Sequence, residues 1–358
     1  MIQPNQHLLG IHRISERMHE RGQYIRLDRN ERVTPVSTEI FGDMLSSLSP
    51  ESFCAYPDPS PLYERLSKHL GLSEDYIYLT NGSDAAIRMA FQTYIRPGDL
   101  VAFPDPTYAM YSIYTAIFRA QSRTVAYAPD MTLDISRFLA WLGSKSERPR
   151  LLAIPNPDQP TGSTLTERCI QSLATAASDA GAVIIIDEAY FPFYPCTAVP
   201  LVREFENIIV TRTFSKVGGL AGLRIGYMVA NPSIVNNIQR IRGAHEVNAI
   251  ALAIGSYVLD HPELSEEYLM EIREGRKVLA ATAQELGLGF PPCPTNFQLL
   301  RFPGVNGTGK IVSALKEKGY LVKGDFSSPA VRDCIRVTLA GPEVMQGFAN
   351  RLRDVLSV

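Results

Sequence analysis

The sequence predicts an α/β protein in which a largely parallel sheet is covered by helices and is followed by a small α+β domain. Through the first two thirds of the chain, short apolar runs alternate with helical stretches. The apolar residues in these runs are continuous, as in strands that are buried on both faces of a sheet. The last third instead contains two or three strands with two helices. A chain of 358 residues also exceeds one typical core, which favours one large and one smaller domain.

The expected elements follow one another in the order that a covered parallel sheet requires. In the first part, the apolar runs predict strands at residues 75–80, 99–104, 150–155, 183–187, 207–214 and 223–230. The stretches between them predict helices at residues 83–95, 108–120 and 165–181. The C-terminal part predicts strands at residues 296–302, 320–324 and 334–340 and helices at residues 310–319 and 343–356.

Three parts of the chain are expected from this order. An N-terminal segment of residues 1–35 would pack against the small domain and the pocket, and residues 36–260 would form the large domain. Residues 261–358 would form the small domain. The segment from about 232 to 285 is expected to be mostly helical and to connect the two domains.

Composition limits the classes of partner. The net charge of −2 gives no electrostatic reason to expect nucleic acid or an anionic membrane. No apolar run approaches the roughly 20 residues that cross a bilayer, and the polar N-terminus is no secretory signal. The five cysteines are scattered and form no C-x-x-C pair. A reducing cytoplasm is therefore expected, with no metal site.

The chemistry is expected where strands end, because open α/β sheets bind ligands at the carboxyl ends of their strands. In TNGSDAAIRMA (80–90), the residues Gly82, Ser83 and Asp84 stand between a strand and a helix. Free amides and the positive end of a helix dipole suit a phosphate at such a place. An ordinary helix N-cap is the alternative interpretation.

Two further turns follow buried strands. PDPTYAMY (104–111) places Tyr108 where its ring either stacks on a planar ligand or packs into the core. NPDQPTG (156–162) is a loop that contains proline and glycine. It either carries polar side chains into a cleft or forms a tight turn.

A carboxylate ends the most apolar of these strands. In GAVIIIDEAY (181–190), Asp187 follows a run of branched aliphatic residues. Removing a carboxylate from water is costly unless a cation or a donor pairs with it, and a protonated pyridine nitrogen is such a partner. Tyr190 is placed to reach a ring hydroxyl. A surface carboxylate just beyond the strand is the alternative.

Lys216 lies in the most informative motif, TRTFSKVGGLAGLRIGY (211–227). Its amine can form a Schiff base with an aldehyde, and Ser215 and Arg224 suit a phosphate. A solvated loop lysine is the alternative interpretation. A lysine amine and an acidic group at the pyridine nitrogen are what pyridoxal 5′-phosphate (PLP) requires of a protein. The residues therefore predict a PLP enzyme that acts on amino groups.

These motifs occur together in a known family. The chain resembles the fold-type I PLP enzymes of the class I/II aminotransferases, which have an aspartate aminotransferase-like fold. Within them it is similar to the histidinol-phosphate aminotransferases and their paralogues. The resemblance runs from LDRNERV (27–33) to the C-terminal helix and includes AYPDPS (55–60), TNFQLLRFP (295–303) and IRVTLAG (335–341).

The resemblance implies a role for each matching residue. Lys216 would hold the cofactor as a Schiff base and shuttle protons, Asp187 would pair with the pyridine nitrogen, and Tyr190 would bond the ring hydroxyl. Tyr108 would stack on the ring. The cofactor phosphate would be surrounded by Gly82, Ser83, Asp84, Thr213, Ser215 and Arg224.

The resemblance also implies partners and substrates. A homodimer is expected, in which Tyr56 reaches the cofactor phosphate of the neighbouring subunit. Arg336 matches the arginine that binds the anionic end of the substrate, and Asn30 lies in a segment that borders the pocket. Glutamate is the expected amino donor. A small phosphorylated amino alcohol or its carbonyl counterpart is the other expected substrate.

Three departures from the family pattern concern the substrate. Gln159 stands where an asparagine usually bonds the ring hydroxyl, so that hydrogen bond must be lengthened or rearranged. Lys323 stands where histidinol-phosphate enzymes tend to have another arginine for the substrate phosphate, and lysine lacks the bidentate fork. Residues 11–24 lack the aromatic-rich pattern associated with an imidazole pocket.

Two other functions use the same fold. Decarboxylases of phosphorylated amino acids differ in which substrate bond is oriented for cleavage, and no motif separates them from aminotransferases. Aminotransferase-like domains also serve as effector-sensing parts of transcription regulators. Those carry an N-terminal DNA-binding domain, whereas here the family pattern begins near residue 27.

Overall fold

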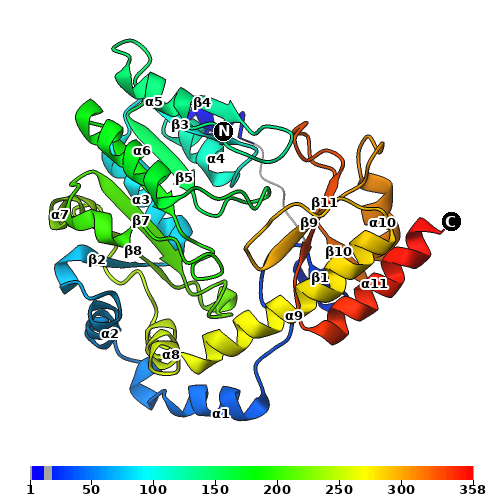
Figure 1. The fold of residues 1–358 in the computed structure, drawn as a ribbon. Coiled ribbons are helices and arrows are strands. Elements are labelled where there is room, and N and C mark those ends of the chain that lie inside the picture. The colour runs from blue at the N-terminus through cyan, green and yellow to red at the C-terminus, as the bar shows by residue number, and fades with distance from the viewer. Residues whose placement is uncertain (1, 12–17, 358) are drawn as a thin grey trace.

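A seven-stranded sheet forms the centre of the computed structural model, which describes residues 2–11 and 18–357 (Figure 1). Its strand order is β2-β8-β7-β6-β5-β3-β4, and in this sheet β8 runs in the direction opposite to the other six strands. The expected, largely parallel sheet is thus confirmed. The strands are β2 (Ile77–Thr80), β3 (Leu100–Asp105), β4 (Gln121–Ala126), β5 (Leu151–Pro155), β6 (Val183–Asp187), β7 (Ile208–Thr213) and β8 (Gly226–Ala230).

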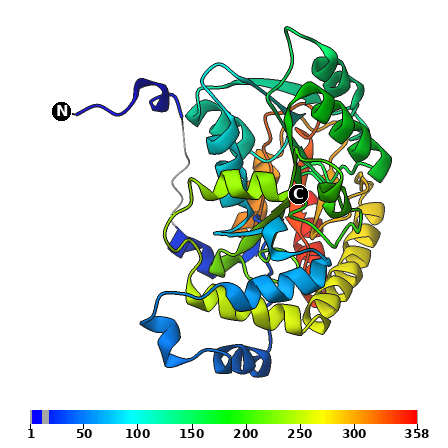
Figure 2. The ribbon, with the colours of Figure 1, turned by 90° about the vertical axis from the view of Figure 1, so that its left-hand side faces the viewer.

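Both faces of this sheet are buried, as the continuous apolar runs predict. In β6, Ile184 and Ile186 belong to one hydrophobic cluster and Ile185 belongs to the other. The first cluster is covered by α1 (Thr38–Ser46), α2 (Ser60–Leu70), α5 (Ser136–Gly143), α6 (Glu167–Ala180) and α8 (Ala249–Asp260). The second is covered by α3 (Ser83–Tyr94), α4 (Met110–Ile117) and α7 (Pro232–Gln239). Figure 2 shows α2 and α8 lying side by side along the first face.

A smaller unit lies beside the sheet and has its own core. Strand β9 pairs antiparallel with β11, and β1 pairs parallel with β10. The long helix α9 leads into this unit and packs against α11 (Figure 1). Its elements are β1 (Ile25–Leu27), α9 (Glu263–Glu285), β9 (Phe297–Arg301), α10 (Gly309–Glu317), β10 (Tyr320–Val322), β11 (Cys334–Thr338) and α11 (Pro342–Leu356).

The strands β4 and β1 were not predicted, and the largest error at the start of a predicted strand concerns β8. β4 has a mostly exposed, polar sequence at the edge of the sheet, and β1 is only three residues long, so neither gives an apolar run. β8 begins at Gly226 rather than at 223, because residues 221–223 form a short 3-10 turn and Arg224 is left-handed. Within the described residues, no helix is long and apolar enough to cross a membrane.

Candidate active site

A cavity of about 380 Å³ opens at the carboxyl ends of three adjacent parallel strands. Pro155, Asp187 and Thr213, which end β5, β6 and β7, all line it. Its wall contains most of the predicted site residues, namely Ser83, Asp84, Tyr108, Gln159, Asp187, Tyr190, Thr213, Ser215, Lys216 and Arg224. Arg29, Glu31 and Asp158 also line it and were not predicted.

The amine of Lys216 lies inside this cavity against the N-terminal segment. It donates hydrogen bonds to the main-chain oxygens of Asn30 at 3.0 Å and Arg29 at 3.4 Å. Burial and the positive charges of Arg336 and Arg224 lower the pKa of Lys216 from its usual 10.5 to about 8. An amine with a lowered pKa has a larger nucleophilic fraction near neutral pH. The geometry thus provides a reactive amine at the expected position.

Asp187 is a buried carboxylate that neighbouring elements hold in place. Its oxygens accept hydrogen bonds from Tyr111 at 2.8 Å, Thr211 at 2.9 Å and the amide of Ala189 at 3.2 Å. Burial raises the pKa of Asp187, while these three donors act in the opposite direction. A cation at the open side of the cavity would stabilise the ionised form.

The sequence reasoning missed the two side-chain donors to Asp187, although each left a signal. Thr211 pairs directly with Asp187 in the register of β6 and β7. Tyr111 stands three residues after Tyr108 in the stretch predicted as a helix over residues 108–120, and a helical turn would bring these two side chains to one side. Both donors follow from the predicted elements once the strand register is known.

The residues that were predicted to bind a phosphate lie together at one end of the cavity. Gly82 has φ +78°, and a Cβ at this position would lie 2.7 Å from the Nη2 atom of Arg224. The α3 helix begins at Ser83, so its first amides lack helical partners. Thr213 donates to the Ser215 hydroxyl at 2.9 Å across the turn after β7. Amides, hydroxyls and a guanidinium therefore surround one small space.

Asp84, a second carboxylate, fixes the tyrosines on one side of the cavity. Tyr108 and Tyr114 donate to the two oxygens of Asp84 at 3.2 and 2.8 Å. Burial, together with the charges of Asp84 and Asp187, raises the pKa of Tyr108. The Tyr108 ring also meets the Tyr111 ring edge-on, with 5.8 Å between their centres. Tyr108 is therefore a neutral phenol in a fixed orientation on the cavity wall.

Tyr190 meets Gln159 and Asn30 on the opposite side. The side-chain amide of Asn30 donates to the Tyr190 hydroxyl at 2.8 Å. Gln159 Oε1 lies 3.4 Å from both the Tyr190 hydroxyl and the Asn30 amide. Asn30 is fully buried and lies behind the cavity wall, whereas its neighbours Arg29 and Glu31 line it.

Arg336, on β11, and Lys323, directly after β10, lie outside the lining of this cavity in the smaller unit. They exchange two main-chain hydrogen bonds, so they are directly opposed on antiparallel segments. Arg336 is 5% exposed and donates to the main-chain oxygen of Asp28 at 2.6 Å. Its Nε has no hydrogen-bond partner among the described residues. Lys323 is exposed.

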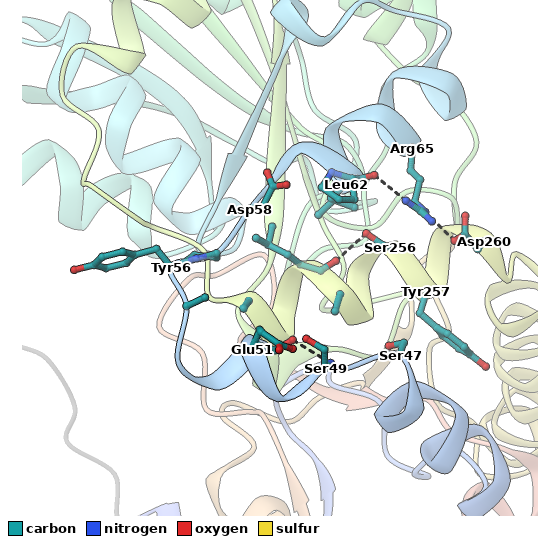
Figure 3. A pocket seen from close by; sticks show the side chains of 17 residues that line it. Ser47, Ser49, Glu51, Tyr56, Asp58, Leu62, Arg65, Ser256, Tyr257 and Asp260 are labelled. Atoms are coloured by element: carbon teal, nitrogen blue, oxygen red, sulfur yellow. Dashed lines mark hydrogen bonds and ion pairs between the residues drawn. The ribbon is translucent and has the colours of Figure 1, made fainter.

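Tyr56, which was also predicted, lines another groove. It is 83% exposed, and its ring stacks on His245 with 4.3 Å between the ring centres. It lines a separate groove of about 480 Å³ between α2, α8 and the 3-10 turn at Pro50–Phe53. Figure 3 shows Tyr56 pointing away from the other labelled side chains of this groove.

A buried ion pair, also missed, lies behind Asp187. Glu188 and Arg212 are both almost fully buried, with 2.8 Å between Oε2 and Nη2. Thr197 donates to Glu188 at 2.9 Å and accepts from Arg212 at 2.8 Å. The Arg212 guanidinium lies 3.6 Å above the centre of the Phe191 ring. The pair fastens the segment that carries Tyr190 to β7.

These groups fit PLP. The cavity offers an amine for its aldehyde, a buried carboxylate for its ring nitrogen and a phenol for its ring hydroxyl. Helix amides, two hydroxyls and a guanidinium are available for its phosphate. The φ of +78° at Gly82 favours glycine, and a side chain there would push the Arg224 guanidinium away from this end of the cavity.

Similar proteins were found by sequence and by structure. A histidinol-phosphate aminotransferase of Thermoanaerobacter pseudethanolicus is 31% identical over 334 residues, which cover 92% of this chain and 93% of that protein. The structure of histidinol-phosphate aminotransferase from Sinorhizobium meliloti in complex with PLP superposes with a TM-score of 0.89. It is 23% identical and covers 100% of this chain and 98% of its own.

A decarboxylase has the same fold at a greater distance. L-threonine-O-3-phosphate decarboxylase from Porphyromonas gingivalis superposes with a TM-score of 0.78 and 21% identity, covering 93% of this chain and 100% of its own. The family model for aminotransferase class I and II matches residues 23–352. The chain therefore belongs to the family of class I and II aminotransferases, enzymes that depend on PLP.

Proposed function

We propose that this aminotransferase moves an amino group between glutamate and a small phosphorylated amine or its carbonyl counterpart, as a histidinol-phosphate aminotransferase does. The observation that carries the proposal is the opposed pair Arg336 and Lys323 beside the cavity that holds Lys216. Directly opposed residues in an antiparallel pair have their side chains on the same face. Two cations on one face suit a doubly charged anion, and the buried Nε of Arg336 is an open donor.

The same proposal assigns the cofactor contacts. Lys216 would attach PLP covalently, Asp187 would hold the proton on the ring nitrogen, and Tyr190 with Gln159 would face the ring hydroxyl. Tyr108 would flank the ring. The phosphate would lie among Gly82, Ser83, Asp84, Thr213, Ser215 and Arg224. The support is that these residues, Gly82 apart, line one cavity and that Gly82 abuts Arg224.

Lys216 would also move the proton. When bound, PLP supplies an aldehyde for an amine and a ring that takes up the electron pair left at the substrate α-carbon. The Nζ atom of Lys216, once free, would take the α-carbon proton as a general base. Its pKa of about 8 keeps a useful fraction of the amine unprotonated near neutral pH. The main-chain oxygens of Arg29 and Asn30 orient it.

The proposal includes a homodimer. Tyr56 would contact the cofactor phosphate bound to the partner subunit, because its exposed ring points away from its own chain's groove (Figure 3). Residues 1–35, 36–260 and 261–358 would form the N-terminal segment, the large domain and the small domain. The segment of residues 11–24, which lacks the aromatic pattern, falls partly outside the described residues. A cytoplasmic location is also proposed, since all five cysteines are free thiols.

A single-turnover assay tests this function. The PLP-loaded protein is mixed with L-glutamate, histidinol phosphate or unphosphorylated histidinol, and the absorbance of the bound cofactor is followed. We expect glutamate and histidinol phosphate to convert the cofactor to its amine form, with histidinol at least about tenfold slower because it lacks the anion. Release of carbon dioxide from a phosphorylated amino acid, without the amine form, would instead identify a decarboxylase.

The variant Lys216→Ala tests the assignment of the amine. It should lower the rate of the half-reaction by about 10⁴-fold or more, because it removes both the attachment point and the general base. The matched control is Lys145→Ala, which removes an exposed lysine on another surface and should leave the rate unchanged. A Lys216→Ala protein that attaches PLP as the unmodified protein does would overturn the proposed function.

A further inference from the structure

Asn30 occupies an unusual place for a polar residue of an N-terminal segment. It lies between β1 and α1, is fully buried and has φ +57°. Asparagine is one of the few residues that adopt this left-handed conformation readily. Its main-chain oxygen accepts hydrogen bonds from Lys216 and from Asn296, each at 3.0 Å. The residue therefore joins the reactive amine to the loop before β9.

The orientation of the Asn30 side chain follows from its contacts with Thr338 on β11. The Thr338 hydroxyl accepts a hydrogen bond from the main-chain N–H of Asn30 at 2.9 Å. Its own proton is therefore free to donate to the Asn30 Oδ1 atom, which lies 3.3 Å away. The other end of the side-chain amide is then the NH₂ group. That group lies 2.8 Å from the Tyr190 hydroxyl and must donate to it.

This donation decides where the Tyr190 proton points. A phenol that accepts from Asn30 still has its own proton to donate. Among the described residues, the acceptor of the Tyr190 hydroxyl is Gln159 Oε1 at 3.4 Å, well beyond the usual 2.7–2.8 Å of an O–H···O bond. Both Tyr190 and Gln159 line the cavity. The phenol proton is thus available to a ligand there.

We propose that Asn30 is a positioning residue that fixes the Tyr190 hydroxyl as a hydrogen-bond donor into the cavity. The sequence of donors runs from Thr338 through Asn30 to Tyr190 and then to the ligand. This inference rests on the proposed function, in which the ligand atom is the ring hydroxyl oxygen of PLP. Asn30 would thereby compensate for Gln159, whose amide is too distant to orient the phenol.

The direction of this hydrogen bond has a measurable consequence. A donor to the ring oxygen stabilises its anionic form and lowers the pH at which the attached cofactor loses its proton. Thr338 stands two residues after Arg336 on β11, so both side chains lie on the same face of that strand. The chain of donors therefore begins on the strand that would bind the substrate anion.

The test is a pH titration of the absorbance of PLP attached to Lys216. Asn30→Asp keeps the size and tolerates the left-handed backbone, but its carboxylate accepts from Tyr190 instead of donating. We expect the midpoint of the absorbance titration to be higher in Asn30→Asp than in the unmodified protein, by about one pH unit or more. Tyr190→Phe, which removes the hydroxyl, should raise the midpoint by a similar amount. Asn30→Gly, which keeps the backbone and adds no charge, should raise it less.

The double variant Asn30→Asp/Tyr190→Phe separates orientation from charge. The added carboxylate raises the midpoint by its charge in either background, whereas the orientation effect requires Tyr190. The increment from Asn30→Asp should therefore be smaller by about half a unit or more when Tyr190 is absent. Equal increments in both backgrounds would overturn the inference.

Failure of the inference about Asn30 can be distinguished from failure of the proposed function. A Tyr190→Phe midpoint equal to that of the unmodified protein would overturn the role of Asn30 and leave the role of Lys216 intact. If Lys216→Ala retains the same absorbance band, PLP is not attached where we propose. Far-ultraviolet circular dichroism of each variant checks that it is folded.

Discussion

The proposed cofactor-binding and substrate-binding sides of the active site, called here the cofactor wall and the substrate wall, are built in different ways. The cofactor wall, formed by Asp187, Thr213, Ser215, Lys216 and Arg224, comes from two adjacent strands and one loop that follows them. The substrate wall consists of Asn30, Lys323 and Arg336, which lie behind or beside the lining of the cavity, and Asn30 is far from the other two in the chain. Asn30 and its partner Thr338, for example, are separated by 308 positions.

The difference extends to hydrogen bonding. On the cofactor wall, the buried Asp187 carboxylate has three protein donors and lies in front of the Glu188–Arg212 pair. On the substrate wall, Arg336 is equally buried, yet its Nε has no partner among the described residues. An internally satisfied wall holds its shape without a ligand, whereas an open buried donor is stabilised when an anion binds.

The prediction with the largest expected effect concerns the contribution of the buried ion pair behind the cofactor wall to stability. Glu188→Ala leaves the Arg212 guanidinium buried without its carboxylate, so unfolding free energy should fall by about 3–5 kcal/mol. Urea denaturation of the PLP-loaded protein measures this. Glu206→Ala, at an exposed position before β7, is the control and should change stability by less than about 0.5 kcal/mol. A loss below about 1 kcal/mol for Glu188→Ala would mean that the pair is not what holds this wall.

Most residues of the cofactor wall could be predicted from the sequence. A strand that ends in Asp187 and a loop that carries Lys216 and Arg224 are local patterns, and parallel strands bring their ends together. Thr211 was missed because its contact with Asp187 depends on the register of β6 and β7, which no local pattern specifies. Glu188 was missed because its cation, Arg212, comes from the next strand.

Much less of the substrate wall was predictable. The family resemblance pointed to Asn30, Lys323 and Arg336, but no sequence pattern brings them together. β1 is too short to be recognised, and its pairing with β10 places residues 27–33 beside the smaller unit. The left-handed backbone of Asn30 and its hydrogen bonds to Thr338 are tertiary contacts without a local signal.

The second prediction concerns Lys216, which both walls influence. PLP attachment requires the unprotonated amine, and burial with Arg336 and Arg224 lowers the pKa of Lys216 to about 8. The attachment rate should therefore rise about 100-fold from pH 6 to pH 9 and level off above pH 8. Stopped-flow absorbance of the PLP-free protein measures it. A rate still rising tenfold per unit above pH 9 would indicate an ordinary lysine.

The third prediction separates the two walls by a single substitution. Arg336→Lys keeps the charge but removes the planar fork, so kcat/KM for the half-reaction should fall by about 10- to 100-fold. The absorbance spectrum of the bound cofactor should stay unchanged, because Arg336 does not line the cavity. Arg332→Lys, an exposed position on the same unit, is the control. An altered cofactor spectrum with unchanged kcat/KM would place Arg336 on the cofactor wall.

The smallest expected effect concerns Lys323, where the chain departs from the family pattern. Lys323 is exposed and shares two main-chain hydrogen bonds with Arg336, so a longer, forked side chain fits there without disturbing the core. Lys323→Arg should therefore raise kcat/KM for histidinol phosphate by about two- to fivefold, through a bidentate contact with its phosphate.

Glutamate has no phosphate, so its half-reaction provides the internal control for Lys323→Arg. Its rate should be unchanged, and Lys318→Arg, at an exposed position before β10, should alter neither reaction. An equal gain for both substrates would show that the substitution acts on the fold or on PLP and not on the phosphate. A loss for histidinol phosphate alone would mean that the compact charge of the lysine fits this phosphate better than the arginine fork does.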